Sequence, residues 1–144
     1  MFTVEIRVGR LLEIRMESPL SAAEVLDFRS VTTATVRAAK RPLVVCTDLL
    51  RARVFSPESA AQITAMMQQD NPLVERNGIL VGESALFSMQ IERMLREAGP
   101  RSRRAFREPA ALKLWLKEVL DENELWRLNA FIMEGVRDDR PPSV

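Results

Sequence analysis

The first 17 residues alternate between hydrophobic and polar positions, which is the spacing of β-strands. The alternation runs over residues 2–8 and again over residues 12–17. Gly9 and Arg10 lie between the two stretches, and glycine at the first central position suits a two-residue hairpin turn. We therefore predict that the chain opens with an antiparallel hairpin with one apolar face.

After the hairpin, hydrophobic residues recur at helical spacing in some segments and form short continuous runs in others. Ser21 and Glu24 make a capping box, so a helix is predicted to begin there. The apolar runs 43–47 and 78–82 have the length of strands that are buried on both faces. The remaining predicted elements are a helix from Ser56, a helix from Ser84, a charged edge strand over 103–107, a helix from Pro109 and a last helix from Asp121.

This order of elements predicts an α/β fold. We expect a mixed sheet of about five strands, in which the hairpin is antiparallel and the later strands are parallel, with helices packed on it and one extra C-terminal helix. The predicted organisation is one domain over residues 1–120, an appended helix over 121–135 and a flexible tail over 136–144.

Composition excludes several classes of protein. The chain has 144 residues, of which 47% are hydrophobic and 28% are charged, as in one ordinary globular domain. The net charge is +1, so a nucleic acid partner is not expected. There is no histidine, no cluster of metal ligands and no pairing of a nucleophile with a base. We therefore expect a protein that is not an enzyme and that uses no metal and no cofactor.

The single cysteine, Cys46, lies in an apolar run and is expected to be a small buried hydrophobic residue. With one cysteine there is no internal disulfide, which fits a cytoplasmic protein. No apolar run has the length of a signal peptide core or of a membrane-spanning helix, so no transmembrane segment is expected.

Three features together resemble the STAS and SpoIIAA-like superfamily over roughly residues 1–120. They are the opening hairpin, the buried strand that ends in Cys46-Thr47-Asp48-Leu49 with a helix about nine residues later, and Gly78-Ile79-Leu80-Val81-Gly82-Glu83-Ser84 leading into a helix. The best-known members are anti-sigma-factor antagonists. The resemblance implies a non-enzymatic protein–protein interaction module with a signalling, regulatory or assembly role in a bacterial cytoplasm.

The resemblance also implies a phosphorylatable serine at the start of the helix that follows the central strand. Matching on Asp48 places this turn at Ser56-Pro57-Glu58-Ser59, where Pro57 occupies the acceptor position. Ser56 and Ser59 are therefore the candidate phosphosites. The other interpretation is that Ser56 and Pro57 simply begin the helix, with Glu58 as a fixed negative charge near that end.

The expected partner surface is the carboxyl edge of the sheet, where open α/β sheets bind ligands. Phe55 and Met66 or Met89 fall outside the predicted inner stripes of the helices, which makes them candidates for surface contacts. Glu83 and Ser84 have a second interpretation, as the first residues of a helix and its cap. The predicted partner-binding residues are Asp48, Arg51, Arg53, Phe55, Ser56, Glu58, Met66, Glu83 and Ser84.

Other features leave alternatives open. The basic group Arg101, Arg103, Arg104 and Arg107 suits either an acidic partner or a solvated edge that resists strand pairing. The hairpin edge invites pairing with a second copy, so a homodimer is a candidate arrangement. The last helix, with Trp126, either covers the sheet or docks on another subunit.

The alternative function is binding of a lipid or another small apolar ligand in a SEC14-like pocket, which the SEC14-like side of the resemblance implies. Its candidate lining residues are Phe55, Met66, Met67, Phe87 and Met89.

Overall fold

The computed structural model of the chain describes residues 1–138. The strands are β1 (Phe2–Ile6), β2 (Leu11–Glu17), β3 (Leu43–Arg51), β4 (Val74–Leu80) and β5 (Arg103–Phe106). The helices are α1 (Ala22–Ala38), α2 (Pro57–Asp70), a short 3-10 turn over Asn71–Leu73, α3 (Ala85–Ala98), α4 (Pro109–Lys117) and α5 (Glu122–Asp138).

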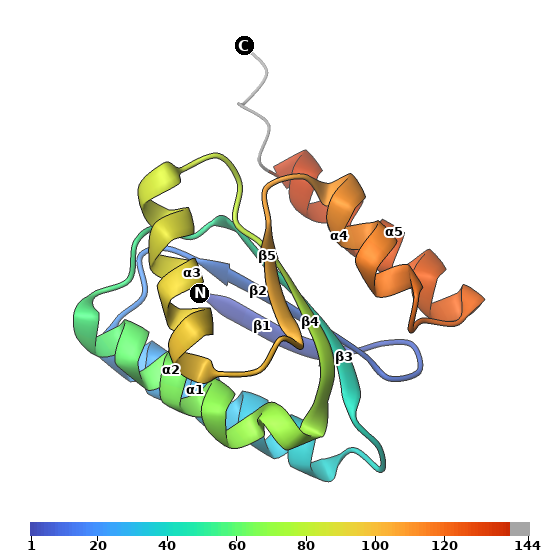
Figure 1. Ribbon diagram of the computed structural model, residues 1–144, viewed down its shortest axis with the longest axis horizontal. Helices are drawn as coiled ribbons and strands as arrows, with labels where there is room; N and C mark the ends of the chain where they lie inside the picture. The colour runs from blue at the N-terminus through green and yellow to red at the C-terminus, as the bar shows by residue number, and fades with distance from the viewer. Residues whose placement is uncertain (139–144) are drawn as a thin grey trace.

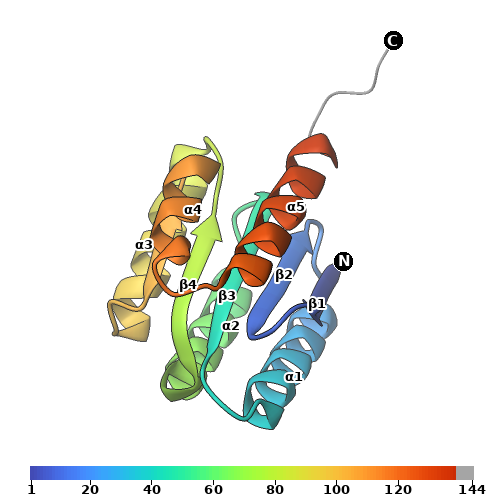
Figure 2. The same cartoon turned by 90° about the vertical axis from the view of Figure 1, so that its right-hand side faces the viewer.

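Within the described residues, the five strands form one mixed sheet in the order β1-β2-β3-β4-β5. β1 pairs with β2 antiparallel, and every later neighbour is parallel. The crossover helices α1, α2 and α3 lie on one face of the sheet, and α4 and α5 lie on the other (Figures 1 and 2). The predicted α/β fold, with its mixed sheet and extra C-terminal helix, is confirmed.

The hairpin differs from the prediction first in its burial, because β2 is buried on both faces. Leu12, Ile14 and Met16 join the core under α1–α3, while Leu11 joins a second core under α4 and α5. Even Glu13 is buried. The reason is the strand order. β2 lies inside the sheet, between β1 and β3, where helices cover both faces of the sheet, and β1 is the edge strand.

Gly9 and Arg10 are the two central residues of the hairpin turn. The Leu11 N–H donates to the Val8 carbonyl at 3.2 Å, which closes the turn. Gly9 has a φ of +56°, a conformation that disfavours residues with a Cβ atom. Strand pairing stops at Ile6 opposite Leu12, so Val8 lies in the turn and not in the strand.

Several predicted boundaries move. β4 covers Val74–Leu80, whereas the predicted run is 78–82. β3 continues to Arg51, beyond the predicted run 43–47, so Asp48 and Arg51 lie in the strand. α5 continues to Asp138, past the predicted end of the last helix at residue 135, and the rest of the predicted tail, residues 139–144, lies outside the described part of the chain.

The last helix covers the sheet. Leu128, Phe131 and Ile132 of α5 are buried against Leu11, Val44 and Cys46 of the sheet and against α4, while Trp126 is exposed. No helix in the described part of the chain is both long enough and apolar enough to cross a membrane.

Candidate functional site

The carboxyl ends of β2 to β5 lie at one edge of the sheet, together with the loops that lead into α1, α2, α3 and α4 (Figure 1). A groove of about 460 Å³ opens at this edge between the loop before α1 and the loop over residues 52–56. Arg53, Phe55 and Ser56, which the sequence assigns to the partner surface, all line this groove. The structure therefore brings part of the predicted site together.

Two helices begin at this edge, each with a serine cap. The Ser56 hydroxyl accepts a hydrogen bond from the Ser59 N–H at 3.1 Å, and the Ser84 hydroxyl accepts one from the Phe87 N–H at 3.2 Å. Pro57 is the first residue of α2. The interpretation of Ser56 and Ser84 as helix caps is confirmed.

The two candidate phosphosites differ in accessibility. Ser56 is exposed, whereas Ser59 is buried in the first turn of α2. Modification of Ser59 would require that turn to open. Glu58, Glu83 and Arg53 are exposed at the same edge.

The loop over residues 52–56 is held firmly against α3. The side-chain amide of Gln90 accepts a hydrogen bond from the Phe55 N–H and donates one to the Phe55 carbonyl, both at 2.8 Å. The Phe55 ring packs edge-to-face on Phe87 at 5.5 Å between centroids. The Arg53 N–H donates to the Ser18 hydroxyl at 2.8 Å. The loop backbone is therefore preorganised.

The prediction that Phe55 and Met66 are surface residues is wrong. Phe55 is 7% exposed and Met66 is 5% exposed, and both belong to the core under α1–α3. α2 lies between α1 and α3 and shares the core with the sheet, so it buries a wider face than a single stripe. Met89, the alternative, is 69% exposed.

Asp48 is also displaced from the predicted surface, because it is buried under α5. Arg15 of the neighbouring strand β2 donates its Nε–H to the Asp48 carboxylate at 2.8 Å and its Nη2–H to the Phe131 carbonyl of α5 at 2.8 Å. A Cβ atom at Gly135 would overlap the Asp48 carboxylate, so α5 approaches the ion pair as closely as glycine permits. Asp48 therefore helps to seat α5.

A second buried ion pair lies beside the first. Both Glu13 oxygens accept hydrogen bonds from Arg127 of α5 at 2.8 Å. These bonds to Glu13, aided by Glu134, raise the pKa of Arg127 above its usual value. Sequence reasoning missed this pair because Glu13 occupies a polar position of an alternating strand, and only the position of α5 shows that this face is covered.

Arg51, another predicted site residue, pairs with Glu17 at the carboxyl ends of β3 and β2 at 3.1 Å.

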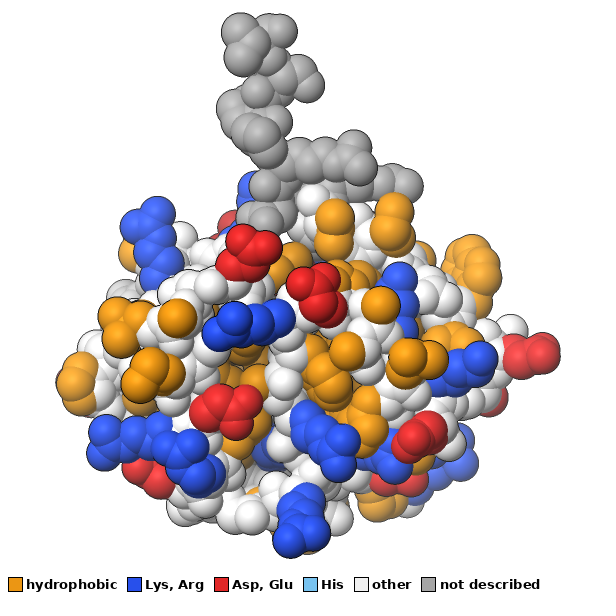
Figure 3. Space-filling view, turned by 45° about the horizontal axis from the view of Figure 1, so that its top comes forward, with side chains coloured by type: hydrophobic (Ala, Val, Ile, Leu, Met, Phe, Trp, Pro, Cys, Tyr) orange, Lys and Arg blue, Asp and Glu red, His pale blue; other side chains and the backbone are white. Residues whose placement is uncertain are grey.

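The apolar side chains that are exposed at the carboxyl edge were not all foreseen. Val54 is 46% exposed and Leu86 is 67% exposed, next to Met89 on α3. Figure 3, in which this edge is tilted toward the viewer, shows hydrophobic side chains among separate basic and acidic ones. The sequence indicates the exposure of Leu86 and Val54 only weakly, since each directly precedes a residue of the core, Phe87 or Phe55.

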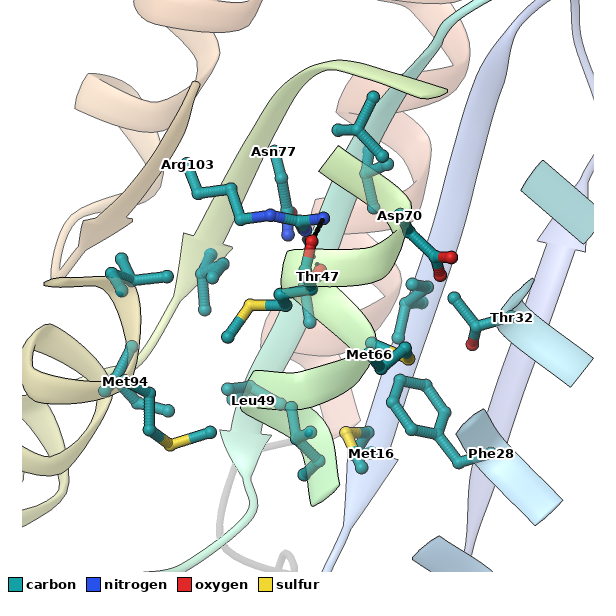
Figure 4. A pocket seen from close by; sticks show the side chains of 18 of the residues that line it. Met16, Phe28, Thr32, Thr47, Leu49, Met66, Asp70, Asn77, Met94 and Arg103 are labelled. Atoms are coloured by element: carbon teal, nitrogen blue, oxygen red, sulfur yellow. Dashed lines mark hydrogen bonds between the residues drawn. The ribbon is translucent and has the colours of Figure 1, made fainter. Parts of the chain in front are cut away.

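A cavity of about 50 Å³ lies between the sheet and α1–α3 (Figure 4). Met16, Phe28, Leu49 and Met94 lie in the lower part of that view, with polar side chains above them. Among the polar ones, Thr47 donates to the Asn77 amide oxygen at 2.9 Å.

Arg103 points into this core, so its assignment to a solvated edge is wrong. It is 7% exposed, and its Nε–H donates to the Asn71 amide oxygen at 2.9 Å. Burial lowers its pKa to about 10, and the charge of Asp70 opposes that shift. Arg101, Arg104 and Arg107 are exposed.

Burial raises the pKa of the Cys46 thiol, and the nearby Asp48 and Glu13 carboxylates add to the shift. Cys46 is fully buried, as the sequence predicts. Within residues 1–138, no group of three or more Cys, Asp or Glu side chains is placed to hold a metal ion.

No model of a known protein family matches the sequence, and a search of curated proteins finds no match.

Proposed function

We propose that this chain is a non-enzymatic protein–protein interaction module of the STAS/SpoIIAA-like type, with a regulatory or assembly role in a bacterial cytoplasm. The order of its elements supports the proposal: an antiparallel hairpin is followed by helix–strand units that build a parallel sheet in chain order. A protein partner binds at the carboxyl edge of the sheet.

The observation that carries this proposal is the exposure of Val54, Leu86 and Met89 on firmly held backbone. Val54 precedes Phe55, whose backbone the Gln90 side chain binds. Leu86 and Met89 lie on the first turns of α3, the helix that carries Gln90. Exposed apolar side chains that polar residues surround are typical of protein interaction sites. A preorganised loop also reduces the entropy lost on binding.

The alternative function, binding of a lipid or small apolar ligand, has less support. The cavity of about 50 Å³ has room for a few water molecules. Pockets for drug-sized ligands are roughly 300–1,000 Å³. A lipid would therefore have to displace part of the core.

The test is a paired substitution at the exposed edge, Val54→Asp with Leu86→Asp. Tagged wild-type and variant proteins are incubated with lysate of the source cells, and captured proteins are quantified by mass spectrometry. We expect a stoichiometric partner on the wild type and a loss of about tenfold or more on the variant, because buried apolar contacts dominate binding energy.

The matched control is Leu26→Asp with Val31→Asp, which places the same charges on the exposed face of α1. This control should retain the partner, and circular dichroism should show that all three proteins are folded. Equal capture by the wild type and by the edge variant would contradict the proposed surface. Co-purification of a lipid with no protein partner would favour the alternative.

A further inference from the structure

We infer that the open edge of β5 binds an extended acidic segment of a partner protein, which adds to the sheet as a further strand. This inference rests on the proposed function and names the chemistry of the partner. The site consists of the β5 backbone, the groove between β5 and α3, and the exposed arginines Arg96, Arg101, Arg104 and Arg107.

The backbone of β5 has one free side. The Ser102 and Phe106 carbonyls accept hydrogen bonds from the N–H of Asn77 in β4 and of Val81, the residue after β4, at 2.8 and 2.9 Å. Because alternate residues of a strand bond to opposite sides, the N–H and C=O groups of Arg103 and Ala105 point away from β4. Among the described strands β5 pairs with β4 alone, and no ribbon lies in front of it in Figure 1.

A groove runs along this free side. It has a volume of about 590 Å³ and lies between α3 and β5, with Met89, Ala105 and Arg107 among its lining residues. Side chains of an added strand would alternate between this groove and the α4 side of the sheet. On that second side, Arg104 stacks over Trp115 at 5.0 Å from the ring centroid.

The charged side chains around β5 indicate the chemistry of the partner. Arg96, Arg101 and Arg107 are exposed and form no ion pair within the described residues, while Glu92 and Glu108 are the exposed acids nearby. Arginine is well suited to bidentate contacts with carboxylates. The Arg103 side chain turns into the core and therefore does not guard the edge.

The same charges disfavour a second copy of this chain. Pairing β5 with β5 would bring Arg104 and Arg107 of both copies close together, and like charges on paired strands are destabilising. An acidic strand removes that repulsion. The edge is short, with four residues, so we expect a modest affinity that the carboxyl-edge contacts supplement.

The test measures direct binding of a synthetic probe, a short capped peptide of alternating glutamate and valine, by titration calorimetry and by backbone amide shifts. One matched peptide replaces each glutamate by glutamine, and another carries N-methyl groups on alternate amides, which blocks strand pairing. The protein variants are Arg104→Glu with Arg107→Glu and, as a charge-matched control, Lys40→Glu with Arg41→Glu at the opposite end of the sheet.

We expect saturable binding of the acidic peptide with shifts at residues 103–107. The affinity should fall about tenfold or more with the glutamine peptide and with the Arg104 and Arg107 variant, and should be retained by the control variant. The N-methylated peptide should not bind, a result that depends on no protein variant.

Each of the following results would overturn the inference: no binding of the acidic peptide, equal binding of its N-methylated form, or displacement by a single-stranded oligonucleotide. Dimerisation of the free protein that Ala105→Pro abolishes would also overturn it and assign the edge to a second copy. None of these outcomes decides the proposed function, which the Val54 and Leu86 variant tests at a separate surface.

Discussion

Asp70 and Arg103 are charged side chains that lie in the core between the sheet and α1–α3. The Thr33 hydroxyl donates to the Asp70 carboxylate at 3.0 Å. Burial nevertheless raises the pKa of Asp70, and the hydrogen bond from Thr33 and the charge of Arg103 only partly oppose it. At the scale of one residue, ionised Asp70 therefore lowers the stability of the fold.

This effect predicts a pH dependence for Asp70→Asn. The folded-state pKa is above the ordinary value of 3.8 for an aspartate, so the folded state holds the proton more tightly than the unfolded state does. The stabilising effect of the proton is complete below pH 3.8 and is lost as the pH rises through the raised pKa. The free energy of unfolding of Asp70→Asn, measured in urea, should therefore rise relative to the wild type over that interval.

Asp27→Asn on the exposed face of α1 is the matched control for the substitution itself. The prediction would be contradicted if the free energy of unfolding of Asp70→Asn fell relative to that of the wild type as the pH rises.

At the scale of the element, α5 is attached to the sheet by buried ion pairs as well as by its apolar face. Arg127 reaches Glu13, and the Phe131 carbonyl binds Arg15, which holds Asp48. Glu124 caps the start of α5 and also accepts a hydrogen bond from the Arg10 N–H in the hairpin turn at 2.7 Å. Removing one charged partner leaves the other buried without compensation, which is strongly destabilising.

We therefore predict that Arg127→Met lowers the free energy of unfolding by about 3 kcal/mol, because Glu13 loses a bidentate partner. Adding Glu13→Gln to this variant should restore more than half of the loss, because it removes the buried carboxylate, whose remaining ion pair is the long one with Arg7 at 3.8 Å. Chemical denaturation of the two single variants and the double variant measures the coupling.

Arg93→Met removes an exposed pair with Glu97 on α3 and should change stability by less than about 0.5 kcal/mol. If Arg127→Met changed the free energy of unfolding as little as this control does, the buried ion pair would not be what holds α5 on the sheet.

At the scale of the whole molecule, one sheet divides the described residues into two cores. Cys46 lies in the middle strand β3, between Glu13 of β2 and Gly78 of β4, and belongs to the core that α4 and α5 cover. The thiol therefore becomes accessible when α5 leaves the sheet or when the whole fold opens.

Labelling of Cys46 with a chromogenic disulfide reagent distinguishes these two events. We expect negligible labelling in native buffer, because the thiol is buried and its pKa is raised. The rate should increase with urea in parallel with global unfolding. Ser30→Cys in a Cys46→Ala background is exposed on α1 and should label at once. Fast labelling of the wild type in native buffer would show that α5 opens separately.

Much of the fold follows from local pattern. The spacing of Leu12, Ile14 and Met16, the capping box of Ser21 and Glu24, and the Ser56 and Ser84 caps all predict elements that the structure contains. These signals are local because hydrogen bonds and caps join residues that are close in sequence. The order of elements then limits the sheet to a mixed arrangement.

The site depended more on packing between distant segments. A helical stripe predicts one buried side, but α2 packs against α1, α3 and the sheet, so Met66 is buried and only the tertiary packing reveals it. Asp48 is buried because α5, far along the chain, lies over it. The sequence by itself determined the elements and their order, since those depend on near neighbours. Only the tertiary structure decided which faces remain open to a partner, because exposure depends on every element packed against a residue.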